Sequence, residues 1–196
     1  MNRVAPLTIA IVSSLLWLAL PPAALAQPRE KGFAEFGVGP AAFDSTPPTQ
    51  GGNEGTFAVG YIFLGGWLNP RWLVGVDLGA AGSDVSGQVL PVWFSGVVSH
   101  YPRATSGFHV KGSVGISEAT LDIVDEFGET DFAELGTGLS LMAGTGWDVH
   151  LWRRLWLTPA VNIRYGRPGD LVVAGRTTVR GWRYHTVDFT VGIRFD

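Results

Sequence analysis

Four histidines, His100, His109, His150 and His185, are the residues of this chain best suited to acid–base chemistry near neutral pH. A hydrolytic site would need one of them within hydrogen-bond distance of a nucleophile. Ser99 directly precedes His100, and adjacent residues of a strand point to opposite faces of the sheet. The chain has no cysteine, which excludes a thiol nucleophile. We therefore find no catalytic set and expect no enzymatic activity.

Metal, phosphate and cofactor sites are not indicated either. No histidines or acidic residues have the spacing of a metal-ligand set. Gly136-Thr137-Gly138 and Gly144-Thr145-Gly146 resemble phosphate loops in composition, but such a loop requires a helix N-terminus behind it, and these glycines lie in a segment with strand periodicity. A net charge of −3 also argues against a nucleic-acid partner. We expect no metal and no cofactor.

A second group of chemically notable residues consists of charges set among Gly, Ser, Thr and Ala. Its members are Glu35, Asp77, Lys111, Asp148, Arg164, Asp188 and Arg194. If this small-residue face points into a closed interior, each charge needs a partner, because an unpaired buried charge costs several kcal/mol. Glu35, Asp77 and Lys111 lie at similar depth, and so do Arg164 and Asp188, so we predict ion pairs that plug the lumen. The alternative is a narrow ion path in which one pair exchanges partners.

Strands must position these charges, because apolar residues recur at every second position. Val187, Phe189, Val191, Ile193 and Phe195 show this best. The pattern predicts eight strands and no helix in the mature chain; the strands are 32–39, 56–67, 72–82, 88–101, 108–117, 132–149, 155–165 and 184–195. In the fourth segment, residues 92–94 (VWF) leave open which face is the apolar one.

Short and long connections alternate along the chain. Residues 68–71, 102–106 and 151–154 are tight, whereas 40–55, 122–131 and 166–181 are longer and polar, with 83–87 a shorter member of the same side. Eight antiparallel strands then have all short turns at one end. We therefore predict an all-β fold, an eight-stranded antiparallel up-and-down transmembrane β-barrel with short periplasmic turns and longer extracellular loops.

The polarity of the two faces indicates which solvent surrounds the barrel. Only 16% of the residues are charged, and the apolar face is almost free of charge across its centre. A soluble lipocalin-like ligand-binding barrel, the alternative, would carry frequent Lys and Glu outside and an apolar interior. The inverse pattern is the one that lipid requires.

The first residues have the layout of a secretory signal. Asn2-Arg3 is followed by an apolar run from Leu7 to Leu20, by Pro21-Pro22 and by Ala24-Leu25-Ala26. A membrane-spanning helix would need about 20 apolar residues. We predict a cleaved signal peptide over 1–26 and an outer-membrane β-barrel domain over 27–196.

Aromatic residues flank the three tight turns. They are Trp67, Trp72, Tyr101, Phe108, Trp147, Trp152 and Trp156. Amphipathic rings collect at the boundary between membrane and water. We predict that these residues form the periplasmic aromatic girdle.

Three strings, 32–39 (GFAEFGVG), 107–115 (GFHVKGSVG) and 187–195 (VDFTVGIRF), resemble the small eight-stranded outer-membrane β-barrel proteins of the OmpA-transmembrane-domain-like or OmpX-like kind. The resemblance implies a monomer in outer-membrane lipid with a structural or surface-interaction role. It also implies assembly by the barrel-assembly machinery, which reads a final aromatic residue; here Asp196 follows Phe195. Some barrels of this size modify lipid A. In the lipid A deacylase family a Ser lies two residues after the catalytic His, but here the residue two positions after His185 is Val187.

Two predicted outside loops differ in sign. One carries Asp122, Asp125, Glu126, Glu129 and Asp131; the other carries Arg167, Arg176, Arg180 and Arg183. Guanidinium groups suit phosphates, so the arginines could contact lipopolysaccharide. Solvated charges or rim salt bridges between the loops are the alternative.

Overall fold

The computed structural model describes residues 32–46, 54–82, 89–124, 130–134, 136–173 and 176–196. The predicted signal peptide lies outside the described residues. The strands are β1 (Gly32–Thr46), β2 (Glu54–Asn69), β3 (Trp72–Gly82), β4 (Val89–His100), β5 (Phe108–Val124), β6 (Thr130–Glu134), β7 (Gly138–Trp147), β8 (Val149–Trp152), β9 (Leu155–Val173) and β10 (Arg176–Phe195). No helix in the described part of the chain is long and apolar enough to cross a membrane.

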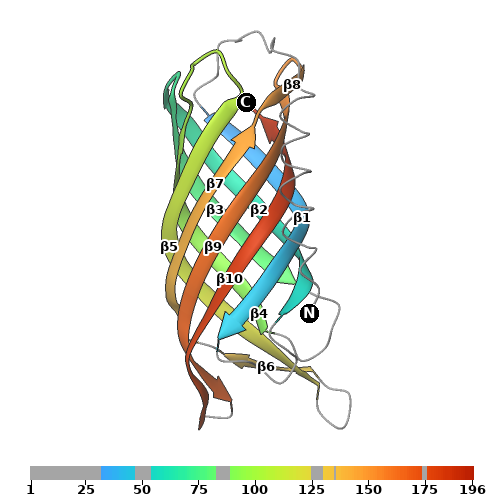
Figure 1. The fold of residues 1–196 in the computed structure, drawn as a ribbon, viewed down its shortest axis with the longest axis vertical. Helices are drawn as coiled ribbons and strands as arrows, with labels where there is room; N and C mark the ends of the chain where they lie inside the picture. Colours follow the sequence, from blue (N-terminus) through green and yellow to red (C-terminus); the bar gives the residue numbers. More distant parts are fainter. Residues whose placement is uncertain (1–31, 47–53, 83–88, 125–129, 135, 174–175) are drawn as a thin grey trace, which may run out of the picture.

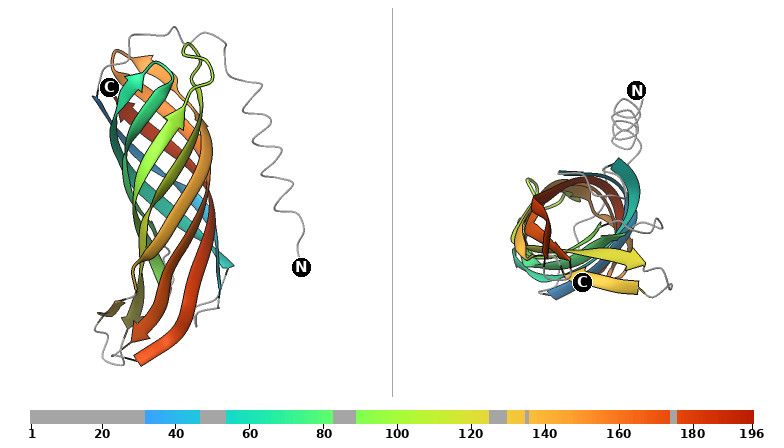
Figure 2. Two further views of the ribbon diagram at one scale, coloured as in Figure 1. Left: turned by 90° about the vertical axis from the view of Figure 1, so that its left-hand side faces the viewer. Right: turned by 90° about the horizontal axis from the view of Figure 1, so that it is seen from below.

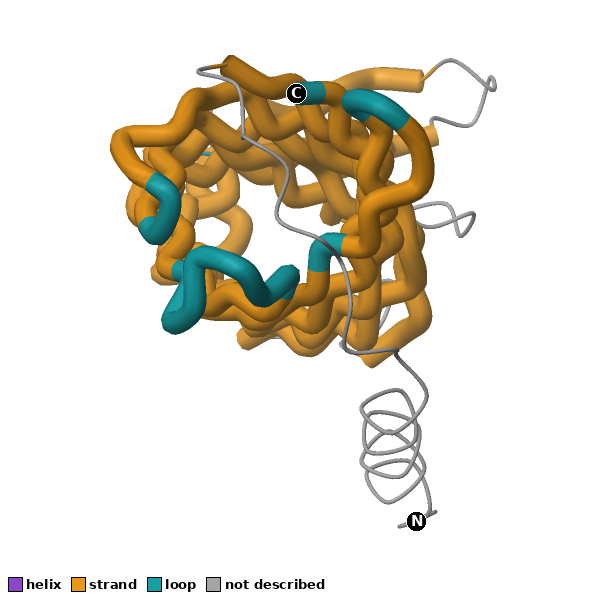
Figure 3. Tube along the Cα trace, turned by 90° about the horizontal axis from the view of Figure 1, so that it is seen from above, coloured by secondary structure: helices purple, strands orange, loops and turns teal. Residues whose placement is uncertain are grey.

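The strands form one closed antiparallel barrel (Figure 1). Each wall strand pairs with its neighbours in sequence, and β10 pairs with both β9 and β1, so the sheet has no open edge around its girth. Seen along the axis, the wall is a continuous ring (Figure 2, Figure 3). The predicted eight-stranded up-and-down barrel is therefore confirmed.

The sixth wall strand is divided into β6, β7 and β8. Both β6 and β7 pair with β5, while β7 and β8 pair with β9 in one register as far as His150, beyond which the β8–β9 register shifts. The single strand predicted over 132–149 is thus interrupted at residues 136–137 and at Asp148. The second interruption matters for the site, because Asp148 is fully buried in the interior.

The strands are longer than the sequence pattern predicted at the end opposite the short turns. β9 and β10 occupy most of 166–181, and β1 and β2 occupy much of 40–55, both of which were predicted as loops. A hairpin continues to satisfy its own backbone hydrogen bonds beyond the barrel, and the Val- and Thr-rich sequence around its tip favours strand. The β9–β10 pairing has three register shifts in this region, of the kind that β-bulges produce. Gly169 and Gly181 have φ of 103° and 64° there.

The two ends of the barrel differ in shape. The C-terminus and the short turns lie at one end, and β6 and the β9–β10 hairpin extend at the other (Figure 1). In outer-membrane barrels short turns are periplasmic and longer connections extracellular. The end with the short turns is therefore called periplasmic, and the end with β6 and the β9–β10 hairpin is called extracellular.

Side chains alternate between the lumen and the outer surface along every wall strand. The open question about β4 is resolved: Trp93 is buried inside, and Val92 and Phe94 are exposed outside. The face with Glu35, Asp77, Lys111, Arg164, Asp188 and Arg194 points inward, as the sequence pattern predicted.

Candidate functional site

The outer wall carries an apolar belt around the barrel. Its exposed residues include Phe36, Val38, Ile62, Leu64, Leu78, Phe94, Val114, Leu141, Ile163, Val187 and Ile193. On β9 from Leu155 to Tyr165, no outward position is charged. This length matches the 9–11 residues or so that a tilted strand needs to cross a bilayer. The polarity is opposite to that of a soluble ligand-binding barrel.

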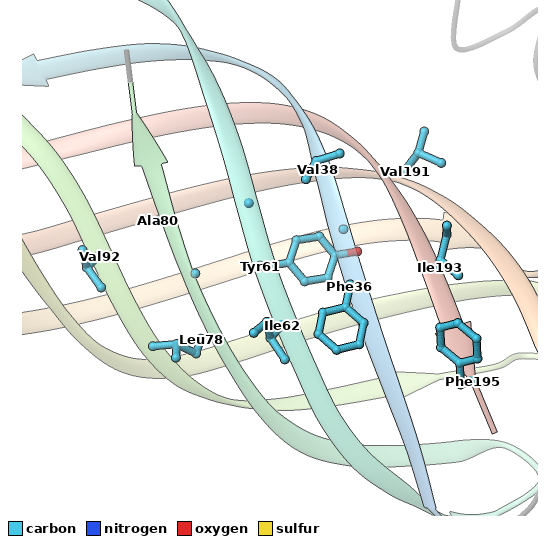
Figure 4. A pocket seen from close by; sticks show the side chains of 13 residues that line it. Phe36, Val38, Tyr61, Ile62, Leu78, Ala80, Val92, Val191, Ile193 and Phe195 are labelled. Atoms are coloured by element: carbon cyan, nitrogen blue, oxygen red, sulfur yellow. The ribbon is translucent and has the colours of Figure 1, made fainter. Parts of the chain in front are cut away.

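A shallow groove crosses this belt from β10 to β4. Phe36, Ile62, Leu78 and Val191 lie along it (Figure 4), and its floor is open beside Gly60, where an added Cβ would meet no atom within 4 Å. Apart from Tyr61, the side chains that line the groove are apolar. It is therefore part of the hydrocarbon-facing surface.

The belt gives a direct stability prediction. Ile163→Lys places a charge in hydrocarbon near the middle of β9 and should cost about 2–4 kcal/mol of unfolding free energy. Urea unfolding in lipid bilayers measures this. Arg167→Lys, four residues further on the same outward face, is the matched control and should be nearly neutral, because that position lies at the rim. Equal stability of the Ile163→Lys variant and the unmodified protein would contradict the assignment of this face to lipid.

The residues of the predicted periplasmic girdle lie on both faces of the wall. Trp72 lies outside and packs on the His100 ring at 4.4 Å, Phe108 and Trp147 pair on the outer wall at 6.0 Å, and Trp152 is exposed near the last turn. Three further members face the lumen instead of the interface: Trp67, Tyr101 and Trp156, the last two of them buried. Alternation along the strands explains the inward position: Trp156, for example, lies on the same face of β9 as Arg164.

These inward rings lie around Arg194 near the periplasmic end of the lumen. The Arg194 guanidinium carbon lies 5.4 Å from the Trp156 ring centroid, 5.8 Å from that of Trp67 and 5.9 Å from that of Phe33. Cation–π attraction is strongest in such a dry setting. Trp67 and Trp156, which the sequence predicts at the membrane interface, therefore line the buried site of Arg194 instead.

Two carboxylates contact Arg194: Asp148, which is fully buried, and Asp196, whose Oδ1 accepts from Arg194 Nε at 3.0 Å. Arg194 Nη2 donates to Asp148 Oδ2 at 2.8 Å, and the Tyr101 hydroxyl donates to the same oxygen at 2.8 Å. Thr158 donates to Oδ1 at 3.3 Å, and His109 Nδ1 lies 3.6 Å from that atom. Arg194 and Asp148 are 1% and 0% exposed as side chains, so the pair is fully enclosed. We call Arg194, Asp148, Tyr101, Trp67 and Trp156 the periplasmic cluster.

A second cluster fills the middle of the lumen. Arg164 Nη2 lies 3.2 Å from Asp77 Oδ2, and Trp93 Nε1 donates to that same oxygen at 3.0 Å. The Arg164 guanidinium also lies 3.8 Å from the centroid of the Trp93 ring. One carboxylate and one ring thus hold the guanidinium of Arg164 in place.

The remaining central charges do not form the predicted pairs. Lys111 Nζ lies 5.4 Å above the Tyr61 ring and makes no ion pair with any described residue. The Tyr61 hydroxyl donates to Glu35 Oε1 at 2.6 Å, and Asn162 Nδ2 donates to Asp188. The groupings of Lys111 with Glu35 or Asp77, and of Arg164 with Asp188, were therefore wrong. When the barrel closes, β3 lies across the lumen from β9. The position of a residue along its own strand does not show which residues it meets across the lumen.

Two glycines make room for the large rings of the lumen. An added Cβ at Gly37 would lie 2.3 Å from the Tyr61 ring, and one at Gly166 would lie 2.1 Å from the Tyr184 ring. Glycine is required where a ring lies flat against the wall.

An aromatic cluster fills the extracellular half of the lumen. It comprises Phe43, Phe57, Trp93, Trp182 and Tyr184, all buried. The Phe43 ring lies 4.4 Å from Phe57 and stacks on Tyr184 at 5.8 Å. The Tyr184 hydroxyl is 2.8 Å from Ser117 Oγ. The described wall strands thus enclose three successive layers of packed side chains.

The histidines are not assembled into a catalytic site. His109 contacts Asp148, His150 contacts the Arg153 carbonyl, and the rings of His100 and His185 pack on Trp72 and Tyr165 respectively. None of these contacts is with a Ser or Thr hydroxyl. Within the described ranges, no three His, Asp or Glu side chains are close enough together to hold a metal ion.

The extracellular arginines lie on the outer wall and the rim. Arg167 on β9 and Arg180 and Arg183 on β10 are exposed. Arg176 is the first residue of β10, but its side chain is outside the described part, as are the side chains of the predicted acidic loop 122–131. Asp170, on the same hairpin, accepts the backbone N–H of Gly181 at 2.7 Å.

Comparison with known proteins is informative at the level of structure. No protein-family model and no curated protein matches the sequence. Neisserial surface protein A superimposes with a TM-score of 0.63 at 13% identity, covering 86% of this chain and 99% of that one. Ail, the attachment invasion locus protein of Yersinia pestis, gives 0.56 at 11% identity, covering 85% and 100%. This chain has the fold of the small outer-membrane β-barrels. With its apolar belt, that fold assigns the barrel to the outer membrane.

Proposed function

We propose that this outer-membrane barrel is a non-enzymatic protein with a closed lumen, acting through its extracellular surface. The observation that carries this proposal is the filling of the lumen by the periplasmic cluster, the central charges and the aromatic cluster. An eight-stranded wall encloses an interior that side chains can fill completely. A solute would have to displace a buried ion pair at two separate levels.

Biogenesis follows from the proposed location. We expect export through a signal peptide over 1–26 and insertion by the barrel-assembly machinery. The closing strand offers it the outward-facing Phe195, which is exposed on the periplasmic side of the belt. We expect a monomer, since the belt and rim together are compatible with a barrel surrounded by lipid.

The surface that we propose to be functional is the group of Arg167, Arg176, Arg180 and Arg183. Three of them, Arg167, Arg180 and Arg183, are exposed on the outer wall beyond the apolar belt. The guanidinium group binds phosphate and sulfate oxygens in a bidentate manner. The structure of Ail is a complex with the heparin analogue sucrose octasulfate, a polyanion. We propose lipopolysaccharide phosphate as the anion that contacts these arginines.

Charge removal tests this contact. Changing Arg167, Arg176, Arg180 and Arg183 together to Gln should reduce the lipopolysaccharide that co-purifies with the barrel, because each lost guanidinium removes charge-assisted hydrogen bonds. The measurement is lipopolysaccharide per mole of protein after detergent extraction.

The chain offers a matched control with the same change in charge. Arg71, Arg103, Arg153 and Arg154 are exposed at the periplasmic end, and their change to Gln should leave the bound lipid unchanged. Both variants should keep the heat-dependent gel migration of a folded barrel. Undiminished lipid in the extracellular variant would contradict the proposed contact. Altered lipid A masses in cells that express the protein would favour the lipid A-modifying alternative instead.

A further inference from the structure

A small cavity lies within the central cluster of charges. Its volume is about 10 Å³, and it is lined by Asp77, Lys111, Met142, Asn162, Arg164 and Asp188, among others. These residues come from β3, β5, β7, β9 and β10, so the cavity lies on the axis of the barrel rather than within its wall.

Four buried polar atoms of the lining have no hydrogen-bond partner among the described residues. Two are acceptors, Asp77 Oδ1 and Asn162 Oδ1, and two are donors, Arg164 Nε and Arg164 Nη1. Each of these three residues is only 4% exposed. A buried polar atom without a partner costs about 1–3 kcal/mol, so four such atoms on three residues that line one cavity point to a shared ligand.

We propose that this cavity is a binding site for one long-lived water molecule. A volume of about 10–15 Å³ is what a single water requires, and water typically makes 2–4 hydrogen bonds to such groups. It can donate to two acceptors and accept from two donors, which is the set present here. A bound anion would face the carboxylates of Asp77 and Asp188, and a bound cation would face Arg164 and Lys111.

This water would join two halves of the central cluster that lack a direct contact. On one side is the Asp77–Arg164 ion pair, and on the other is the Asn162–Asp188 hydrogen bond. The inference rests on the proposed closed lumen, because a water exchanging through an open path would not remain in place. Its residence time is therefore a measurable property of the site.

Met142 is a natural reporter of the cavity. The chain has two methionines, and Met1 falls in the predicted signal peptide. Protein labelled with ¹³C-methyl methionine in detergent micelles should therefore show one methyl signal from the mature barrel. We expect cross-relaxation between this methyl and water, of opposite sign in the laboratory and rotating frames, which marks a water bound for longer than nanoseconds.

Two variants provide the controls. In the Leu141→Met, Met142→Leu variant, the reporter moves one residue along β7 to the outer belt, and no such water signal is expected. Asn162→Leu removes one acceptor at similar volume and should weaken or abolish the signal at Met142. The unmodified protein decides the question by itself if that variant does not fold.

The outcomes separate this inference from the proposed function. No water signal at Met142, with no ion conductance, would overturn the water site and leave the closed lumen standing. Cross-relaxation of equal sign in both frames would mean mobile water and would overturn both. A bromide ion in the cavity of crystals grown in bromide would overturn the water site in favour of an anion site.

Discussion

Arg194→Met should lower the free energy of unfolding by about 3–5 kcal/mol, because it leaves the fully buried Asp148 without its cation. The hydrogen bonds from Tyr101 and Thr158 remain, but neither brings a positive charge. Urea unfolding in bilayers or micelles, followed by heat-dependent gel migration, measures the loss.

A double variant separates the lost pair from lost packing. Adding Asp148→Leu to Arg194→Met removes the unpaired charge, so part of the stability should return. Arg103→Met, at an exposed position of the same end, is the control and should be close to neutral. A loss below 1 kcal/mol for Arg194→Met alone would contradict the role given to the periplasmic cluster.

Arg164→Met should destabilise the barrel by a similar amount, about 3–5 kcal/mol, since Asp77 then stays buried without its ion pair. The Trp93 ring also loses its contact with the Arg164 guanidinium. The same unfolding assay measures this loss.

Lys111→Met is the matched control for this second prediction. Lys111 is at a similar depth and is also a central cation, but it forms no ion pair with a described residue. We expect a smaller loss, about 1 kcal/mol. Equal losses in the two variants would mean that total charge in the lumen, rather than the Asp77–Arg164 pair, determines stability.

The sequence predicts the wall of this barrel well because strand period is a local property. Alternation along residues such as Val187 to Phe195 gives both the strand and its outward face, and the charges at Lys111 and Arg164 were placed inside for the same reason. The signal peptide over 1–26 stays a prediction, because it lies outside the described residues.

The contacts across the lumen could not be predicted in this way. Asp77 and Arg164 meet because strands far apart in sequence face each other once the sheet closes. Tyr61 and Trp93 donate hydrogen bonds to Glu35 and Asp77. Both are uncharged, so a search for charged lumen residues does not find them, although both lie on the inward face of their strands. Trp67, Tyr101 and Trp156 match the girdle in ring type and in their position beside the turns, but they alternate in phase with inward residues and so face the lumen.

The closed lumen is tested most directly by single-channel recording of the purified barrel in planar lipid bilayers. Two buried ion-paired layers and an aromatic layer should prevent ion flow, so the account predicts no conductance steps above the bare bilayer at either polarity. Reproducible conductance steps from folded, monomeric protein would contradict it and would favour a gated ion path through the lumen.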